Sequence, residues 1–316
     1  MNDMILILNY SDEFAVEAAR RLRGEQVFCK IISGMTTAAQ IAQAAPRGIV
    51  LCGEPQSAAG VFDAEILKLG IPVLALGHAA HMLITAMGGA CAGTAISHRK
   101  ASVQYAECRL FSGVEAGERY IQEAMTLMLP ADVQVTAGAG GCTIAFADDR
   151  RSLFGIQFEL ERNDPDGSTI LKNFARDICG CMPWFTMDAA LAEARRMLAD
   201  ASIEGGFAVC GVSGGVDSAV AAVLAHQAFG ERMTAIYVET GLMREGGSAA
   251  VQETFERLGI PLRVADRAES VLAGLRGKQT MREKREVVVA CLHEEMIRQT
   301  EAIPGAKTLV MGTNYS

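Results

Sequence analysis

The sequence predicts an α/β protein of two domains, each a mainly parallel sheet flanked by helices. Two observations carry this prediction. Short apolar runs alternate with helical segments along most of the 316 residues, which is the pattern of β-α units that share one buried sheet. The alternation is interrupted at Met182–Phe185, which contains a proline and two aromatic residues. Because a chain of this length corresponds to about two domains, we expect one domain over residues 1–185 and a second over residues 186–316.

In the first half, apolar runs predict three strands of the parallel sheet, over residues 4–8, 48–52 and 71–76. A helix is expected over residues 14–23, after the first strand, and another near Ala79, after the third. Three later segments are separated by Gly-rich or Asp-Asp turns and predict hairpin strands near residues 133–135, 143–146 and 153–158. A helix over residues 168–179 would close this domain.

In the second half, Thr186 is a suitable N-cap for a helix over Met187–Ala199. Beyond it the β-α alternation resumes. We expect strands over residues 207–212, 233–238, 261–265 and 308–311, and helices over residues 216–229, 247–258 and 281–300. The chain ends directly after the last of these strands, so the second domain is expected to be truncated at its C-terminus.

Composition argues against two classes of partner. Half of the residues are hydrophobic, 21% are charged and the net charge is -8, which fits a globular protein with no basic surface for nucleic acid. The apolar stretch Ile71–Ile96 contains Pro72 and two histidines, and it predicts a strand and a helix rather than a membrane span. The N-terminus has no basic segment before its acidic residues, so we expect no signal peptide, no membrane association and a cytoplasmic location.

The nine cysteines show no metal-site spacing. Cys179 and Cys181 form the only close pair, with one intervening residue and no second pair to complete four ligands. We interpret the cysteines as reduced thiols of the core or of loops.

One segment has the residues of a phosphate-binding loop. The apolar run Ala208–Val212 predicts a central strand and Ala219–Ala225 a helix, and between them the chain reads Ser213-Gly214-Gly215-Val216-Asp217-Ser218. A glycine-rich turn between strand and helix directs backbone N–H groups at an anion and lets the backbone approach phosphate oxygens closely. Serine hydroxyls add donors, and a carboxylate such as that of Asp217 can hold Mg²⁺. No Gly-Lys-Ser/Thr ends the segment, so it is not a Walker loop. The simpler alternative is a tight turn at a helix start.

This loop resembles the pyrophosphate loop of N-type ATP pyrophosphatases, and further segments narrow the resemblance to GMP synthetases. Val238-Glu239-Thr240-Gly241-Leu242-Met243-Arg244 resembles that family's Val-Asp-Asn-Gly-Leu-Leu-Arg. Ile178–Cys181 and Trp184–Met187 are similar to its interdomain junction, and Gly312-Thr313 to the end of its fourth strand. The resemblance covers nearly the whole chain. It implies an adenine nucleotide alpha hydrolase-like domain that binds ATP and Mg²⁺.

The resemblance also implies site residues. ATP would be bound by Ser213, Gly214, Gly215, Val216, Asp217, Ser218, Val238, Gly312 and Thr313, with Asp217 as the metal ligand. Lys284-Arg285 lies where the family has a basic pair in its lid region, so Lys284 joins Asp217 as a catalytic candidate. On a helix with Arg282, Glu283 and Glu286, this basic pair is equally well explained as a solvated face. Glu239 is one methylene longer than the family's Asp, which leaves its role open.

The first domain resembles the class I glutamine amidotransferase domain of GMP synthetases, but its catalytic positions differ. The family's elbow Gly-Ile-Cys-Tyr-Gly corresponds to Ala75-Leu76-Gly77-His78-Ala79, so Gly77 replaces the nucleophile. Its Gln-Phe-His-Pro-Glu corresponds to Gln157-Phe158-Glu159-Leu160-Glu161, so Glu159 replaces the base while Glu161 is retained. The oxyanion turn Gly-Gly-Pro becomes Gly53-Glu54-Pro55, which puts negative charge where an oxyanion needs stabilisation. We therefore predict a catalytically degenerate domain, and we interpret His78 and His81 beside the elbow as packing residues.

The function implied is an AMP-forming ligase that adenylates XMP or a similar nucleotide acceptor for amination by ammonia, either free or from a separate glutaminase. Two alternatives remain: an NAD synthetase-like amide ligase with another acceptor, and a non-catalytic nucleotide-binding or scaffold subunit. GMP synthetases hold XMP largely with residues beyond the position of Ser316, including their C-terminal dimerisation domain. We therefore expect this chain alone to turn over XMP negligibly, and a homodimer only if a longer protein carries that domain.

Overall fold

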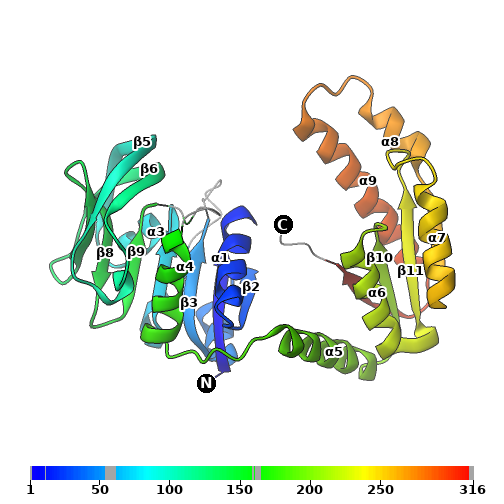
Figure 1. The fold of residues 1–316 in the computed structure, drawn as a ribbon, viewed down its shortest axis with the longest axis horizontal. Coiled ribbons are helices and arrows are strands. Elements are labelled where there is room, and N and C mark those ends of the chain that lie inside the picture. The colour runs from blue at the N-terminus through cyan, green and yellow to red at the C-terminus, as the bar shows by residue number, and fades with distance from the viewer. Residues whose placement is uncertain (1, 11, 54–61, 159, 161–164, 313–316) are drawn as a thin grey trace. The chain divides into compact units, whose positions relative to one another are not determined.

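A computed structural model describes residues 2–10, 12–53, 62–158, 160 and 165–312. It divides the chain into two compact units, the first ending at Thr186 and the second beginning at Met187 (Figure 1). Each unit is built on its own sheet with helices packed against it, so the predicted α/β fold class is confirmed.

The first unit contains a nine-stranded sheet in the order β2-β1-β3-β4-β9-β8-β7-β5-β6 among the residues described. Its first five strands are parallel: β2 (Cys29–Ser33), β1 (Asn2–Asn9), β3 (Pro46–Cys52), β4 (Val73–Leu76) and β9 (Leu153–Ile156). Antiparallel strands extend it: β8 (Cys142–Asp148), β7 (Gln134–Ala139), β5 (Ala90–Tyr105) and β6 (Gly117–Met128). The expected hairpin strands are therefore present, but the long β5–β6 pair was not predicted.

Helices cover both faces of this sheet, because alternate residues of its central strands point to opposite sides. Ile5 and Ile7 pack with residues of α1 (Asp12–Gly24) and α4 (Pro165–Lys172), while Leu6 and Leu8 pack with residues of α2 (Ala38–Ala44) and α3 (Ala79–Ala86). A short 3-10 helix (Ala64–Leu69) also contributes to the second face. The helix expected over residues 168–179 is split, because α4 gives way to a π-helical turn at Asn173–Ile178.

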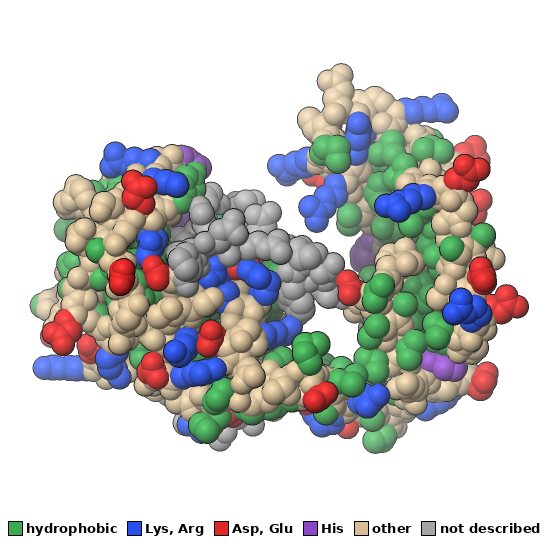
Figure 2. Space-filling model, in the orientation of Figure 1, with side chains coloured by type: hydrophobic (Ala, Val, Ile, Leu, Met, Phe, Trp, Pro, Cys, Tyr) green, Lys and Arg blue, Asp and Glu red, His purple; other side chains and the backbone are tan. Residues whose placement is uncertain are grey.

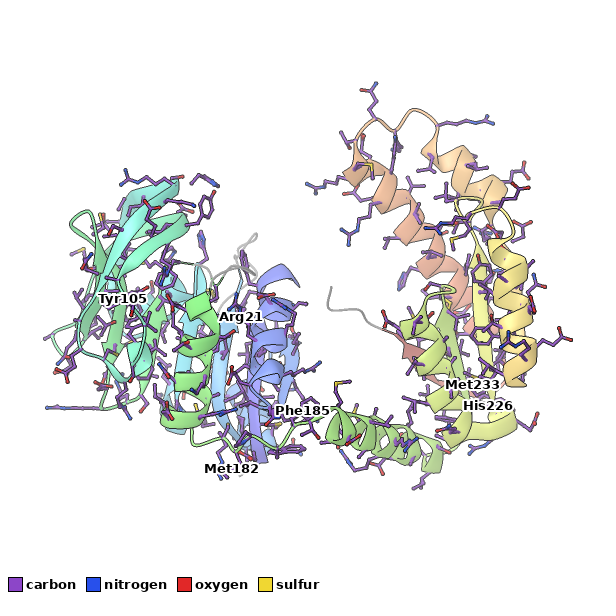
Figure 3. The ribbon with its side chains drawn as sticks, viewed as in Figure 1. Arg21, Tyr105, Met182, Phe185, His226 and Met233 are labelled. Carbon is purple, nitrogen blue, oxygen red and sulfur yellow. The ribbon has the colours of Figure 1, made fainter. Side chains whose placement is uncertain are left out.

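The segment after this turn is held to the first unit by an aromatic cluster. The ring of Phe28 lies 5.6 Å from that of Trp184 and 4.9 Å from that of Phe185. The Trp184 indole N–H donates to the backbone carbonyl of Asp3, and the Phe185 amide donates to that of Gln26. Figure 3 labels Phe185 at the end of this segment. The chain is thus anchored through Phe185, and the next helix, α5 (Met187–Ile203), packs on the second unit.

The second unit contains four parallel strands in the order β12-β11-β10-β13. These are β10 (Phe207–Val212), β11 (Met233–Glu239), β12 (Leu262–Asp266) and β13 (Ala306–Met311). Helices α5, α6 (Val216–Phe229) and α7 (Gly247–Leu258) contribute to the core on one face, and α9 (Met281–Glu301) to that on the other; α8 (Ala268–Leu275), which was not predicted, packs on α9. The order reverses between β10 and β13, and α/β sheets bind ligands at the carboxyl edge of such a switch point.

Acidic and basic side chains are interspersed over the visible face of each unit (Figure 2). None of the helices in the described ranges is both long enough and apolar enough to cross a bilayer.

Candidate functional site

The Ser213–Ser218 loop joins the carboxyl end of β10 to the first turn of α6. Gly214 has a φ of +82°, a conformation that favours glycine, and a Cβ there would lie 2.7 Å from the Val251 side chain of α7. Gly215 is the N-cap of α6 and has no side chain to cap the helix. The N–H groups of the first helical turn have no intrahelical acceptor, so they are available to an anion in front of this turn.

A cavity of about 380 Å³ lies beside the loop, at the carboxyl edge of β10, β11 and β13. Its polar lining includes Ser213, Ser218 and Thr240. The remaining lining is apolar or glycine: Gly211, Val212, Ile236, Tyr237, Val238, Leu242, Met243, Val288, Leu292, Met296, Met311 and Gly312. A predominantly apolar cleft with a few polar groups at one end is typical of a small-molecule site. The structure therefore brings Val238 and Gly312 together with the loop.

Of the two expected catalytic residues, Asp217 and Lys284, neither is among the described residues that line the cavity. Asp217 is an exposed residue of the first turn of α6. Lys284 precedes Val288 by one helical turn, so it shares the face of α9 that lines the cavity. Arg282 is different, because its guanidinium is paired with Glu286 at 3.0 Å. Neither Lys284 nor Arg285 has an ion-pair partner within the described ranges. Thr313 lies outside the residues that the structure describes.

Glu239 has a structural role in the turn that follows β11. Its carboxylate accepts a hydrogen bond from the Gly241 amide at 2.8 Å, and the Thr240 hydroxyl accepts one from the Leu242 amide at 3.4 Å. Gly241 has a φ of +72°, a conformation that favours glycine, and the carboxylate of Glu239 closes the turn. Glu239 thus braces the segment that carries Leu242 and Met243 to the cavity.

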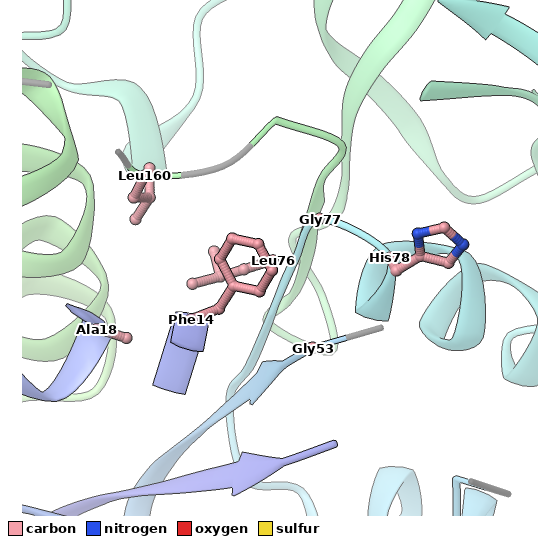
Figure 4. A pocket seen from close by; sticks show the side chains of 7 residues that line it. All are labelled: Phe14, Ala18, Gly53, Leu76, Gly77, His78 and Leu160. Atoms are coloured by element: carbon pink, nitrogen blue, oxygen red, sulfur yellow. The ribbon is translucent and has the colours of Figure 1, made fainter. Parts of the chain in front are cut away.

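In the first unit, β4 meets α3 at a sharp elbow centred on Gly77. Gly77 has a φ of +59°, and its amide donates to the Ile156 carbonyl of β9 at 2.8 Å. A cavity of about 20 Å³, which has room for about one water molecule, borders this elbow. Phe14, Leu76 and Leu160 lie together on one side of Gly77, and His78 lies on the other (Figure 4). Glu159, Glu161, Glu54 and Pro55 lie outside the described residues.

His81, which is 7% exposed, is fixed by Gln157. The Gln157 amide group donates to the carbonyls of Met125 (3.0 Å) and Thr143 (2.7 Å), so both of its protons are used. Its oxygen, which accepts from the Met125 amide, lies 2.5 Å from His81 Nε2, so His81 donates through Nε2. Burial lowers the pKa of His81, with the neighbouring charge of His78 acting in the same direction. His81 is therefore a neutral packing residue.

His78 and four cysteines of the first unit have defined surroundings. His78 Nε2 lies 3.8 Å from a Glu123 carboxylate oxygen, and its ring meets that of His81 edge-on at 4.8 Å. Burial raises the pKa of the Cys52 and Cys91 thiols, which suppresses the reactive thiolate. Burial also raises the pKa of the paired thiols, Cys179 and Cys181, the latter to about 12.

Comparison with known proteins fits this geometry. Residues 193–314, which include the strand-loop-helix site, match the family model described as NAD synthase. Along its whole length the chain is homologous to GMP synthases. The glutamine-hydrolysing GMP synthase of Rhodopseudomonas palustris is 32% identical over 332 residues, which cover 100% of this chain and 61% of that protein. The glutamine-hydrolysing GMP synthase of Limosilactobacillus reuteri is 31% identical over 331 residues, which cover 99% of this chain and 63% of that protein.

This chain therefore spans about three fifths of the length of these relatives. Among solved structures, a glutamine amidotransferase of Thermotoga maritima matches 57% of this chain and 99% of its own, with a TM-score of 0.47 and 12% identity. In sequence the chain is thus similar to glutamine-hydrolysing GMP synthases, and its second unit to the NAD synthase family model.

Proposed function

We propose that the second unit binds ATP with Mg²⁺ and adenylates XMP or a similar acceptor, which ammonia then aminates with release of AMP. The observation that carries this proposal is the adjacency of an anion-binding loop and an apolar cavity at one sheet edge. The cavity accommodates a purine base, while Ser213–Ser218 holds the β and γ phosphates and leaves the α phosphate to the acceptor.

The charges at the site suit this chemistry. No group of three or more His, Cys, Asp or Glu side chains suited to a metal occurs in the described ranges, so Mg²⁺ would enter with the nucleotide phosphates and take Asp217 as a protein ligand. Lys284, on the cavity face of α9, would approach the nucleotide as a point charge that offsets the negative charge developing during transfer. Positioning supplies much of the rate of such a reaction, on the order of 7 kcal/mol or more, so the acceptor must be held in line with the α phosphate.

We further propose that the first unit does not hydrolyse glutamine. Gly77 has no nucleophile, the elbow cavity holds about one water, and the neighbouring thiols have raised pKa values. Ammonia would therefore be free or supplied by another protein. Gly77→Cys alone should not restore glutamine hydrolysis, because the base is also replaced. Glutamate release by the unchanged chain, abolished by a thiol-alkylating glutamine analogue, would contradict this.

The test of the ligase is to incubate the purified chain with ATP, Mg²⁺, XMP and either ammonium or glutamine. We expect amination with ammonium and not with glutamine. Label exchange between pyrophosphate and ATP, dependent on XMP, would report adenylation even without amination.

Two other functions make different predictions. The match of residues 193–314 to the NAD synthase model favours, as the second candidate, an amide ligase with a carboxylate acceptor. Such an enzyme would catalyse label exchange between pyrophosphate and ATP in the presence of deamido-NAD, and not in the presence of XMP. A non-catalytic subunit would bind ATP without exchanging label with either acceptor.

A further inference from the structure

One carboxylate of α9 is buried. Glu295 is 1% exposed, although a charged group is unfavourable away from water unless it is paired. Arg298 donates to both oxygens of this carboxylate, from Nη2 at 2.5 Å and from Nε at 2.9 Å, and the Gln299 amide group donates at 2.7 Å. The hydrogen bonds from Arg298 hold the pKa of Glu295 below its usual value in spite of the burial. Glu295 is therefore ionised at neutral pH.

The same carboxylate faces Arg267, the residue before α8. The Nε atom of Arg267 is buried and has no hydrogen-bond partner among the described residues, and it lies 3.8 Å from the Glu295 carboxylate. Because both atoms are buried, salt and water screen this ion pair less than a surface pair. The backbone amide of Arg267 donates at 2.8 Å to the carbonyl of Glu239, at the end of β11. Arg267 thus joins α9 to the turn that carries Leu242 and Met243 to the cavity.

The first half of α9 depends on this connection for its position. The buried residues of the helix are Cys291, Glu295 and Met296, whereas its earlier part packs on α8 and extends with it past the strands of the sheet (Figure 1). Lys284 precedes Glu295 by about three helical turns, so the two residues lie on nearly the same face, roughly 16 Å apart along the axis. A change in how α9 is held at Glu295 would therefore displace Lys284.

The Arg267–Glu295 ion pair is better suited to fixing a position than to adding stability. Removing two charges from water costs free energy that offsets much of their attraction, so apolar residues would stabilise the same contact as well or better. Apolar contact is non-directional and would allow α9 to slide or rotate. A buried carboxylate is satisfied only where its cationic partners lie, which limits α9 to one arrangement.

We propose that Glu295 is a positioning residue, which holds α9 against the turn after β11 through Arg267 and thereby aligns Lys284 with the nucleotide. The alignment of Lys284 rests on the proposed function, because this lysine has a task only if a nucleotide reacts at the site. The attachment of α9 through Glu295 does not depend on that function. Glu295 would raise the rate of adenylation without touching the nucleotide or the acceptor.

The first test is label exchange between pyrophosphate and ATP, with XMP or deamido-NAD as the acceptor. Glu295→Gln should lower the maximal rate about tenfold and change the KM for MgATP little, since a misplaced group costs rate while the loop and the cavity are intact. Glu294→Gln is the matched control, because Glu294 is an exposed neighbour on the same helix, and it should change neither quantity. Arg267→Met should reproduce the loss, and Arg267→Lys, which keeps the charge, should recover much of the rate.

A double variant tests whether Glu295 acts through Lys284. Added to Lys284→Ala, Glu295→Gln should lower the rate no further, because the group that it positions is already absent. Losses that multiply in the double variant would overturn the positioning role.

Amide hydrogen exchange in the ligand-free protein is a readout that does not require activity. Glu295→Gln should accelerate exchange at the Arg267 amide and over residues 285–290, and it should leave the amides of β10 and β11 unchanged. Equal acceleration in all of these segments, or none in α9, would overturn the positioning role. If exchange in α9 responds as expected but the unchanged chain catalyses no label exchange with either acceptor, the proposed function is wrong and the attachment of α9 through Glu295 stands.

Discussion

A Cβ atom added to Gly312 would lie 2.9 Å from the Cα of Ser218 and 3.0 Å from the backbone carbonyl oxygen of Asp217. The end of β13 thus lies directly against the backbone that starts α6. Gly211, on the neighbouring strand β10, has a different environment: its added Cβ would meet the Met311 sulfur at 2.8 Å and the Met296 methyl at 3.4 Å, both at the ends of flexible side chains.

This contrast predicts different outcomes for two matched variants. Gly312→Ala should displace the phosphate loop and lower MgATP affinity at least tenfold, because backbone atoms cannot move aside locally. Gly211→Ala should be tolerated with a smaller loss, since methionine side chains can rearrange. Calorimetric titration of both variants with MgATP provides the comparison. Equal affinities in the two would show that β13 does not constrain the loop.

Asp217→Ala should weaken MgATP binding about tenfold or more, because the variant loses a carboxylate that holds the metal. Binding of ATP in the presence of a chelator should change little. Asp188→Ala is the control, since Asp188 is also an exposed acidic residue in the first turn of a helix, α5. Circular dichroism would verify the fold of both variants. If MgATP affinity is unchanged in Asp217→Ala, the Ser213–Ser218 loop is only a tight turn and does not bind the nucleotide.

Lys284→Ala should lower the rate of adenylation about a hundredfold while changing MgATP affinity less, if its charge acts mainly on the reacting phosphate. Arg282→Ala is the matched control, because Arg282 lies on the same helix but is paired with Glu286. Pyrophosphate exchange measures the rate. Similar effects of the two substitutions would favour a solvated basic face.

His81 predicts a pH dependence of the stability of the first unit. Burial holds its folded-state pKa below the ordinary value of 6.5, so the unfolded chain binds the proton more readily. The stabilising contribution is therefore fully present above about pH 6.5 and is lost as the pH falls toward the lower folded-state pKa. Urea unfolding at pH 7.5 and pH 5.5 should show a smaller loss on acidification in His81→Gln than in the unchanged chain.

Fluorescence of Trp184 lets the urea experiment follow unfolding of the first unit. It is the single tryptophan of the chain and packs on Phe28 of the first unit, so its fluorescence reports unfolding there. His98→Gln is the control, because His98 is exposed. If the unchanged chain, His81→Gln and His98→Gln show the same pH dependence of stability, groups other than His81 are responsible for that dependence.

Features that depend on neighbouring residues in the sequence could be predicted, and features that depend on tertiary contacts could not. The strands β1, β3 and β10 are continuous apolar runs buried on both faces, so their composition alone indicates them. The strands β5 and β6 escaped prediction because much of β5 is exposed and carries Gly, Ala, Ser and charged residues, so their pairing is set by tertiary contact. The π-helical turn at Asn173–Ile178 likewise has no local signal that separates it from an α-helix.

The same reasoning applies to the site. The spacing of Ser213–Ser218 identifies a loop, since strand, glycines and helix are contiguous. The inward hydroxyl of Ser218 and the turn-closing carboxylate of Glu239 depend on where single atoms point, which a motif does not encode. The cavity-lining Met243, Met296 and Met311 come from three separate elements, and only the fold brings them together.

The left-handed backbone at Gly77 has an evolutionary consequence. A side chain with a Cβ in this conformation costs about 1–2 kcal/mol, a strain that glycine does not impose. A glycine at the elbow therefore favours the folded unit, so mutational drift can keep the shape of the elbow without selection for any chemistry there. A substitution of Gly77 by any residue with a Cβ would instead lower the stability of the unit at once.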